Sequence, residues 1–155
     1  MLPIDSLLIV AEDARAQAAP DAAAFEVGVA MDARMDEVYA GRYRWQGGDW
    51  QVLQWPALCS LPALAEAWAG ATGQAVAGSA LAAFGPRLGL PAGGDRIEAE
   101  RDRAGALLRL AVQTARTGQG VDAAEALPLY LRDKVALTSA EREACLLYTS
   151  DAADE

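Results

Sequence analysis

The sequence contains no histidine, and this absence limits the chemistry that the chain can perform. Histidine is the commonest general base and zinc ligand, and the Ser-His and Cys-His pairs of many hydrolases require it. Only two cysteines are present, Cys59 and Cys145, which lie too far apart in sequence for a metal-binding pair. We therefore expect no metal site and no disulfide framework, and a reducing compartment fits this cysteine content.

Positive charge and long apolar runs are also scarce. The 13 Lys and Arg are outnumbered by 22 Asp and Glu, so the net charge is -9. A protein this acidic repels phosphate backbones, and we expect it to reach RNA only through a partner that supplies the basic surface. No apolar run is long enough to span a membrane and no signal-peptide pattern opens the chain, so we expect a cytoplasmic protein without membrane contact.

The 155 residues, of which 53% are hydrophobic, are enough for one domain with a core. Apolar periodicity after Asp5 and Ser6 predicts a helix that Pro20 ends. The remaining pattern predicts strands at 25–31, 36–45 and 50–55, a helix at 60–70, a strand at 75–77, a loop at 84–94, an extended piece at 97 and a helix at 101–117. The predicted buried face of the last helix consists of Leu107, Leu108, Ala111, Val112 and Ala115.

This order of elements predicts the fold class. Three antiparallel strands followed by α-β-α indicate an α/β fold, a mixed sheet with helices packed on it. It is the layout of an actin-like or ribonuclease-H-like lobe. Many unrelated functions use such lobes, so the architecture alone does not identify a function.

Both ends of the chain look unlike the rest. The segment CLLYTSDAADE, residues 145–155, resembles the translation of a sequencing adapter, and we expect it not to be native. Because such a segment was never selected to fit the core, we expect its deletion to leave the thermal unfolding midpoint unchanged. A fall of several degrees would contradict this. At the front, the chain enters a helix almost at once with no leading strand, so we expect that something which preceded it is missing.

The densest polar cluster lies between the first two predicted strands and comprises Asp32, Arg34, Asp36 and Glu37, followed by Tyr39. Carboxylates around one arginine can form a metal or acid–base site. They can also lock a tight turn, with Arg34 hydrogen-bonded to the neighbouring carboxylates or to turn carbonyls. We favour the structural interpretation, because a nuclease would need further acids from later strands. Arg34→Ala should then destabilise the fold.

A second motif, PLYLRDKV, contains Tyr130 and Arg132. Residues two apart project to one face of an extended segment, so the pair can form a docking strip. Alternatively, a terminal strand packs Tyr130 on the core and Arg132 forms a surface ion pair, which we slightly favour. For Trp45, Trp50 and Trp55 we favour packing or a protein interface over base stacking, and for Cys59 a small buried residue.

Three strings, LPIDSLLIVAEDA, DARMDEVYAGRY and ALPLYLRDKVALT, resemble the TsaB family in order and spacing. The resemblance covers about residues 2–144 and corresponds to the rear part of a family member. It implies an actin-like, glycoprotease-like fold of two lobes, of which 1–144 would be the rear lobe and the front lobe is missing. One position departs from the family, which commonly has Gly where Asp36 stands; Asp tolerates a left-handed turn better than most residues.

The resemblance also implies a function. TsaB proteins are non-catalytic partners of TsaD, the enzyme that forms threonylcarbamoyladenosine at position 37 of tRNA, and of TsaE. No cofactor or catalytic residue is then expected, tRNA is contacted only indirectly, and the two motifs (Asp32, Arg34, Glu37, Tyr39, Tyr130, Arg132) are structural or interaction residues. Two alternatives stay open: a metal-dependent hydrolase of the glycoprotease-like class, and an inert fragment that lacks the lobe through which TsaD docks.

Overall fold

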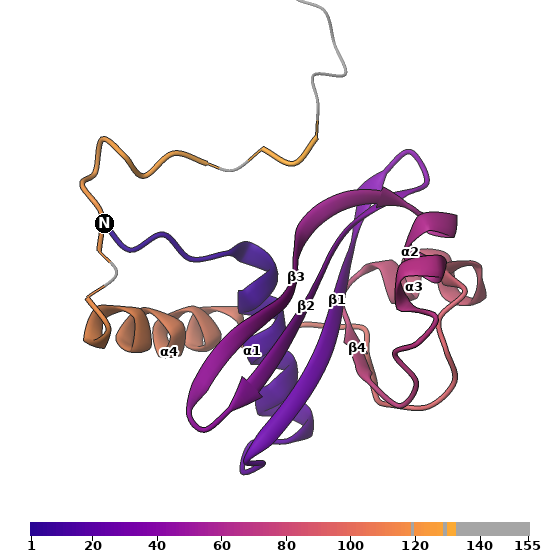
Figure 1. Ribbon diagram of the computed structural model, residues 1–155, viewed down its shortest axis with the longest axis horizontal. Helices are drawn as coiled ribbons and strands as arrows, with labels where there is room; N and C mark the ends of the chain where they lie inside the picture. The colour runs from indigo at the N-terminus through magenta and orange to yellow at the C-terminus, as the bar shows by residue number, and fades with distance from the viewer. Residues whose placement is uncertain (119, 129, 133–155) are drawn as a thin grey trace, which may run out of the picture.

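The computed structural model describes residues 1–118, 120–128 and 130–132, which form one five-stranded sheet with helices on both faces (Figure 1). The predictions for residues 133–155, including the adapter-like tail and Cys145, lie outside the described residues. The elements are α1 (Ser6–Ala18), β1 (Ala24–Arg34), β2 (Glu37–Gln46), β3 (Asp49–Ser60), α2 (Leu61–Trp68), β4 (Ala75–Ala77), α3 (Ala80–Phe84), the 3-10 helix η1 (Gly85–Leu88), β5 (Arg96–Ile97) and α4 (Arg103–Arg116).

The sheet is mixed, as the order of elements predicted. Its strand order is β3-β2-β1-β4-β5; β1, β2 and β3 form an antiparallel meander, while β4 and β5 run parallel to β1. The turn between β2 and β3 uses Gly47 and Gly48, both with positive φ (62° and 91°), which suits a tight hairpin. β3 continues to Ser60, five residues beyond the predicted end, because it pairs with β2 along its whole length.

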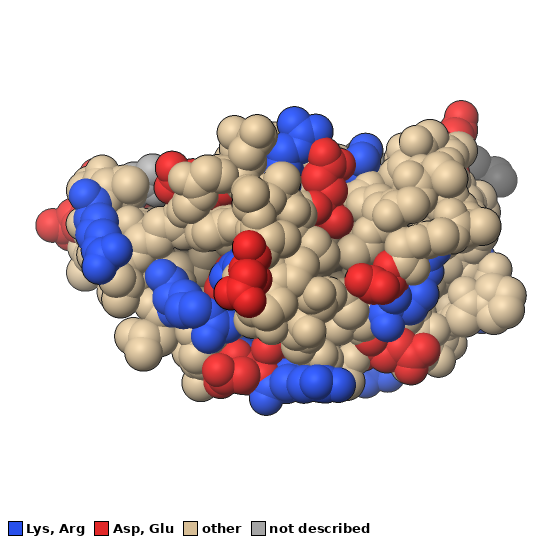
Figure 2. Space-filling view, turned by 90° about the horizontal axis from the view of Figure 1, so that it is seen from below, with Lys and Arg blue, Asp and Glu red and all other residues tan. Residues whose placement is uncertain are grey.

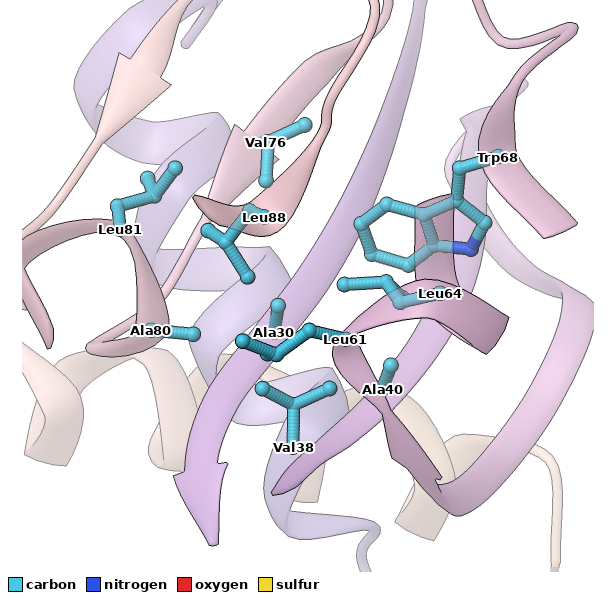
Figure 3. Packing of buried hydrophobic residues seen from close by; sticks show 10 residues of the cluster. All are labelled: Ala30, Val38, Ala40, Leu61, Leu64, Trp68, Val76, Ala80, Leu81 and Leu88. Carbon is cyan, nitrogen blue, oxygen red and sulfur yellow. The ribbon is translucent and has the colours of Figure 1, made fainter. Parts of the chain in front are cut away.

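One face of the sheet is covered by α2, α3 and η1 (Figure 3). Leu61, Leu64 and Trp68 recur at helical spacing and point from α2 toward the strands. They meet the small residues Ala30 and Ala40, which leave room for them. This packing shows why the region predicted as loop at 84–94 is partly ordered: η1 places the fully buried side chain of its last residue, Leu88, in the same core.

The opposite face is covered by α1, whose buried side chains Leu7, Val10, Ala11 and Ala14 pack on the strands. The helix begins where predicted, because the Asp5 side chain accepts a hydrogen bond from the Leu7 N–H at 2.9 Å. The Tyr43 side chain lies fully buried beneath this helix, and its hydroxyl donates to the Asp5 carboxylate. Burial, followed by this contact, raises the pKa of Tyr43.

The predicted buried face of α4 is wrong. The helix lies on α1 and buries only Ala106 and Leu110, which meet Ile9. Leu107, Leu108 and Val112 point outward and are 42%, 64% and 44% exposed. Because α4 packs mainly on α1 (Figure 1), its narrower apolar side makes the contact, and the broader apolar side is exposed in the part of the chain that the structure describes.

Candidate functional site: the β1–β2 hairpin and the 130–132 segment

The turn between β1 and β2 has an unusual backbone. Arg34, Met35 and Asp36 all have positive φ, at 68°, 57° and 56°. Met35 and Asp36 form the two-residue turn of a hairpin whose register shifts between Asp32 and Arg34. Residues with side chains seldom adopt the left-handed region, and a run of them persists only where surrounding contacts hold it.

Part of that support is local. The Asp32 carboxylate accepts a hydrogen bond from the Arg34 N–H at 2.8 Å, and the Asp32 N–H donates to the Ser79 hydroxyl at 3.1 Å. The Arg34 side chain does not provide the predicted lock. It is 89% exposed, and among the described residues the carboxylate that it approaches is that of Asp32, at 3.9 Å. Its left-handed backbone belongs to the turn itself, and the side chain extends into solvent.

The arginine that holds the turn is Arg132. Its guanidinium donates to the Ala33 carbonyl at 2.8 Å, lies 3.5 Å from the Arg34 carbonyl, and forms an ion pair with Glu37 at 2.6 Å. Tyr39, and after it Glu37, raise the pKa of Arg132. A planar guanidinium has several donors in a fixed fork, so it can bind a carbonyl and a carboxylate together. The two sequence motifs therefore meet in space through Arg132.

An apolar groove of about 650 Å³ lies beside this contact. Its walls are the start of α1, residues of β1 to β3 and the 130–132 segment; they include Leu7, Val10, Met31, Tyr39, Trp55, Tyr130 and Leu131. Tyr130 is 84% exposed, so the prediction that it packs on the core is wrong, whereas the predicted ion pair of Arg132 is confirmed. With Trp55, which is 75% exposed, Tyr130 offers aromatic surface at the groove.

The charged groups at this groove already have partners. Asp5 accepts from Tyr43, Arg103 pairs with Glu100 at 2.7 Å, and Arg132 pairs with Glu37. A carboxylate or cation held in this way is a poor general base or acid. Among residues 1–118, 120–128 and 130–132 no group of three or more Cys, Asp or Glu is placed to hold a metal ion. The arrangement suits binding of an apolar or aromatic group.

The different roles of the two arginines make a direct test. Arg132→Ala should lower the free energy of unfolding, because it removes a charge-assisted bond and leaves the turn carbonyls without this donor. Arg34→Ala should change it by less than about 0.5 kcal/mol, since an exposed side chain contributes little. Urea unfolding of both variants measures this difference. A larger loss for Arg34→Ala would show that Arg34 is the lock after all.

Replacing Asp36 by glycine should stabilise the hairpin. Asp36 has φ 56°, which glycine adopts without steric cost. The expected gain is about 0.5–1 kcal/mol. The substitution removes the ion pair between Asp36 and Arg87 at 3.1 Å, in which both side chains are more than half exposed, so this pair contributes little. Asp36→Asn, which keeps some tolerance of this conformation, is the matched control and should change stability less. An unfolding midpoint below that of the parent for Asp36→Gly would contradict the strain argument.

Two buried carboxylates on α1, Glu12 and Asp13, were not singled out from the sequence. Asp13 accepts hydrogen bonds from the N–H groups of Arg101 and Asp102, at 3.0 and 2.8 Å, and so fixes the start of α4. Glu12 accepts from the side chains of Arg15, Arg109 and Trp50. The sequence feature that could have identified Glu12 and Asp13 is that they form an acidic pair beside the apolar stripe of the predicted first helix.

Trp45, Trp50 and Cys59 have packing roles, one of the two roles predicted for the tryptophans, whereas Trp55 is 75% exposed at the groove. Trp45 and Trp50 lie 5.6 Å apart, and the Arg15 guanidinium sits 4.5 Å above the Trp45 ring. Cys59 is partly buried, and burial, followed by the nearby Glu37, raises the pKa of its thiol. It therefore stays protonated and unreactive near neutral pH.

In the described part of the chain, no helix combines the length and apolar character needed to cross a membrane. No protein-family model matches the sequence, and no match to a curated protein was found.

Two solved structures from Pseudomonas aeruginosa are similar to this chain. One, described as an uncharacterized protein with similarity to peptidase YeaZ, is 33% identical with a TM-score of 0.65. The other, YeaZ, is 32% identical with a TM-score of 0.66. Each match covers 83% of this chain but 57% of the solved chain, so this chain spans little more than half of their length. The predicted α/β, actin-like lobe is confirmed, and over most of its length the chain is similar in sequence and fold to YeaZ.

Proposed function

We propose that this chain is the rear lobe of a TsaB protein, the family to which YeaZ belongs, and acts as a non-catalytic partner in threonylcarbamoyladenosine synthesis. The observation that carries the proposal is 33% identity over 83% of the chain. The contact between the two motifs supports it, because Arg132 binds Glu37 and the turn carbonyls of the hairpin. Two strings that resemble one family thus form one structural unit.

A non-catalytic role agrees with the side chains present. The chain has no histidine, which rules out Ser-His and Cys-His pairs and the histidine metal ligands of TsaD. The net charge of -9 disfavours direct binding of tRNA. Figure 2 shows acidic and basic side chains interspersed on the face drawn there, without a broad basic surface. TsaD would therefore catalyse the reaction and bind the tRNA. TsaE would join the complex in the cytoplasm.

The groove beside Arg132 is where we place a contact with a partner protein. It presents the exposed rings of Trp55 and Tyr130 next to an apolar floor, and aromatic residues of this kind dominate protein interfaces. Its charged residues are paired within the chain, so a partner need not neutralise them.

Reconstitution tests this function. TsaD, TsaE, threonylcarbamoyl-AMP synthase and tRNA are combined with or without this chain, and modified adenosine is measured by mass spectrometry of digested tRNA. A non-catalytic partner gives no product when TsaD is omitted and raises the yield when TsaD is present. Product without TsaD would refute the non-catalytic role and favour the hydrolase-like class, which a magnesium or zinc titration then examines.

A pull-down with TsaD separates a working partner from an inert fragment. Binding that is weakened by Tyr130→Ala, but not by the matched surface variant Leu127→Ala, supports a contact at the groove. Leu127 is a suitable control because it is 81% exposed and does not line the groove. If TsaD is not retained at all, this chain does not carry the contact, and the inert-fragment alternative holds.

A further inference from the structure

A second pocket, of about 510 Å³, lies at the end of the sheet where β1 and β4 begin. This is the opposite end of β1 from the hairpin and the groove described above. Its walls are the first residues of β1, the Arg42 side chain on β2, the loop at 70–74 before β4 and the loop at 94–95 before β5. These residues form the pocket without any further segment.

The two loops are held together at Gln74. Gly73 and Gly94 have positive φ, at 78° and 75°. A methyl group on Gly94 would collide with the Gln74 carbonyl, so only glycine permits this close approach. The same carbonyl accepts a hydrogen bond from the Arg96 guanidinium at 3.3 Å. These contacts fix the backbone at Gln74 and place its side chain at the pocket.

The side chains of Arg42 and Gln74 bring hydrogen-bond donors to this pocket. Arg42 Nε donates to Gln74 Oε1 at 3.1 Å, which orients the Gln74 amide. Its other end, Nε2, is buried and has no hydrogen-bond partner among the described residues. Within the same part of the chain, Arg42 Nη1 and Nη2 form no hydrogen bond and no ion pair. A buried amide without an acceptor is destabilising, and native structures seldom keep one without a functional reason.

We propose that Arg42 and Gln74 form a binding site for a small molecule that carries one carboxylate group. Because Gln74 occupies Nε, the two terminal nitrogens of Arg42 can donate in parallel to both oxygens of a carboxylate. One of these oxygens can also accept from Gln74 Nε2. The amide must rotate slightly to reach it, since this nitrogen is covered.

The other charges at the pocket favour a ligand with a single negative charge. Two carboxylates, Glu26 and Asp95, also line the pocket. Glu26 is paired with Arg44 at 2.6 Å, whereas Asp95 forms no ion pair in the described part of the chain. Arg42 can compensate one negative charge, but a dianion would bring a second one toward Asp95. A carboxylate should therefore bind more tightly than a sulfate or a phosphate dianion.

NMR titration of the isotope-labelled full chain with sodium acetate tests the site. Sodium chloride at the same ionic strength is the reference, and sodium sulfate represents a dianion. We expect saturable binding at millimolar acetate, with the largest shifts in the signals of the Gln74 side-chain amide and the Arg42 Nε–H. Sulfate should bind at least about fivefold more weakly, because of its second charge. No saturable shift at these groups, or sulfate binding as tight as that of acetate, would overturn the proposal.

Arg42→Ala should weaken acetate binding by about tenfold or more, because it removes the two parallel donors. Arg87→Ala is the matched control and should leave binding unchanged, since it removes the same charge from an exposed site outside the pocket. Asp95→Asn should strengthen acetate binding by about two- to threefold, because a repelling charge is lost. Unchanged affinity in Arg42→Ala would overturn the assignment.

Gln74→Glu provides a second test that keeps Arg42 in place. The new carboxylate would lie beside the Arg42 guanidinium and pair with it in place of the ligand. Acetate binding should then be lost, while circular dichroism shows a folded protein. A folded Gln74→Glu variant that binds acetate as tightly as the parent would also overturn the proposal. None of these substitutions alters the groove beside Arg132, so the outcome is independent of the proposed function.

Discussion

Trp68→Ala is expected to lower the free energy of unfolding by about 3–5 kcal/mol, the largest effect of any substitution considered for this protein. The Trp68 side chain is only 2% exposed. Its ring covers Gly28, where a methyl group would lie 2.9 Å from two ring carbons. The strand and the ring are therefore in direct contact, and an alanine would leave a cavity between α2 and β1. The indole N–H also donates to Gln54 at 2.9 Å, a hydrogen bond that the variant loses.

Urea unfolding followed by circular dichroism measures this loss, because the signal does not depend on the substituted indole. Trp55→Ala is the matched control: the same side chain is removed, but from a site that is 75% exposed. We expect it to change stability by less than about 0.5 kcal/mol. Similar losses in the two variants would show that α2 does not pack on the sheet as described.

Glu12→Ala is expected to cost about 3 kcal/mol, because removing one member of a buried charge cluster leaves its partners without compensation. Glu12 accepts hydrogen bonds from Arg15 at 3.0 Å, Arg109 at 2.6 Å and Trp50 at 3.1 Å, and its side chain is 3% exposed. Arg109 belongs to α4, so the substitution also weakens the attachment of α4 to α1. The loss stays below that of Trp68→Ala because Arg109 is 42% exposed and can regain water.

Glu26→Ala is the control for this substitution. Glu26 forms an ion pair with Arg44 at 2.6 Å, but both side chains are more than one third exposed. An exposed pair is screened by water and salt, and its removal should cost at most about 1 kcal/mol. Equal losses at the two sites would mean that the burial of Glu12 is not what makes its ion pairs stabilising.

The contribution of Glu12 also depends on pH. Burial alone would raise its pKa, but the hydrogen bonds from Arg15, Arg109 and Trp50, with the charge of Arg15, lower the pKa below its ordinary value of 4.5. A carboxylate with a lowered pKa in the folded state stabilises the fold above its unfolded pKa and loses this effect as the pH falls through its folded pKa. The stability difference between the parent and Glu12→Gln should therefore be full at neutral pH and shrink below about pH 4. A difference that grows in acid would contradict this sign.

The local elements could be predicted from the sequence alone. The capping residue Asp5, the breaker Pro20, the Gly47-Gly48 turn and the run of helical spacing in 61–68 each act within a few residues. Their effect does not depend on the rest of the chain. The α/β class followed from the order of these elements.

The long-range contacts could not be predicted in this way. The sequence indicated an arginine lock at the hairpin, but two arginines were available, and Arg34 was the nearer in sequence. Arg132 reaches Glu37 and the Ala33 carbonyl from almost 100 positions away, because the chain returns across the end of β1. Tyr130 was placed on the core for a similar reason: alternation shows which residues share a face, but not whether another element covers it.

The same distinction explains α4. Its apolar stripe is real, and the sequence determined which residues share it. Periodicity is a property of one helix, whereas burial needs a second surface. Here α1 supplies that surface through Ile9, Glu12 and Asp13, which contact the opposite side of α4 and the loop before it. Only the tertiary structure decided that Leu107, Leu108 and Val112 face outward, because the helix turned its narrower apolar side and its hydrogen-bonded arginine toward the core.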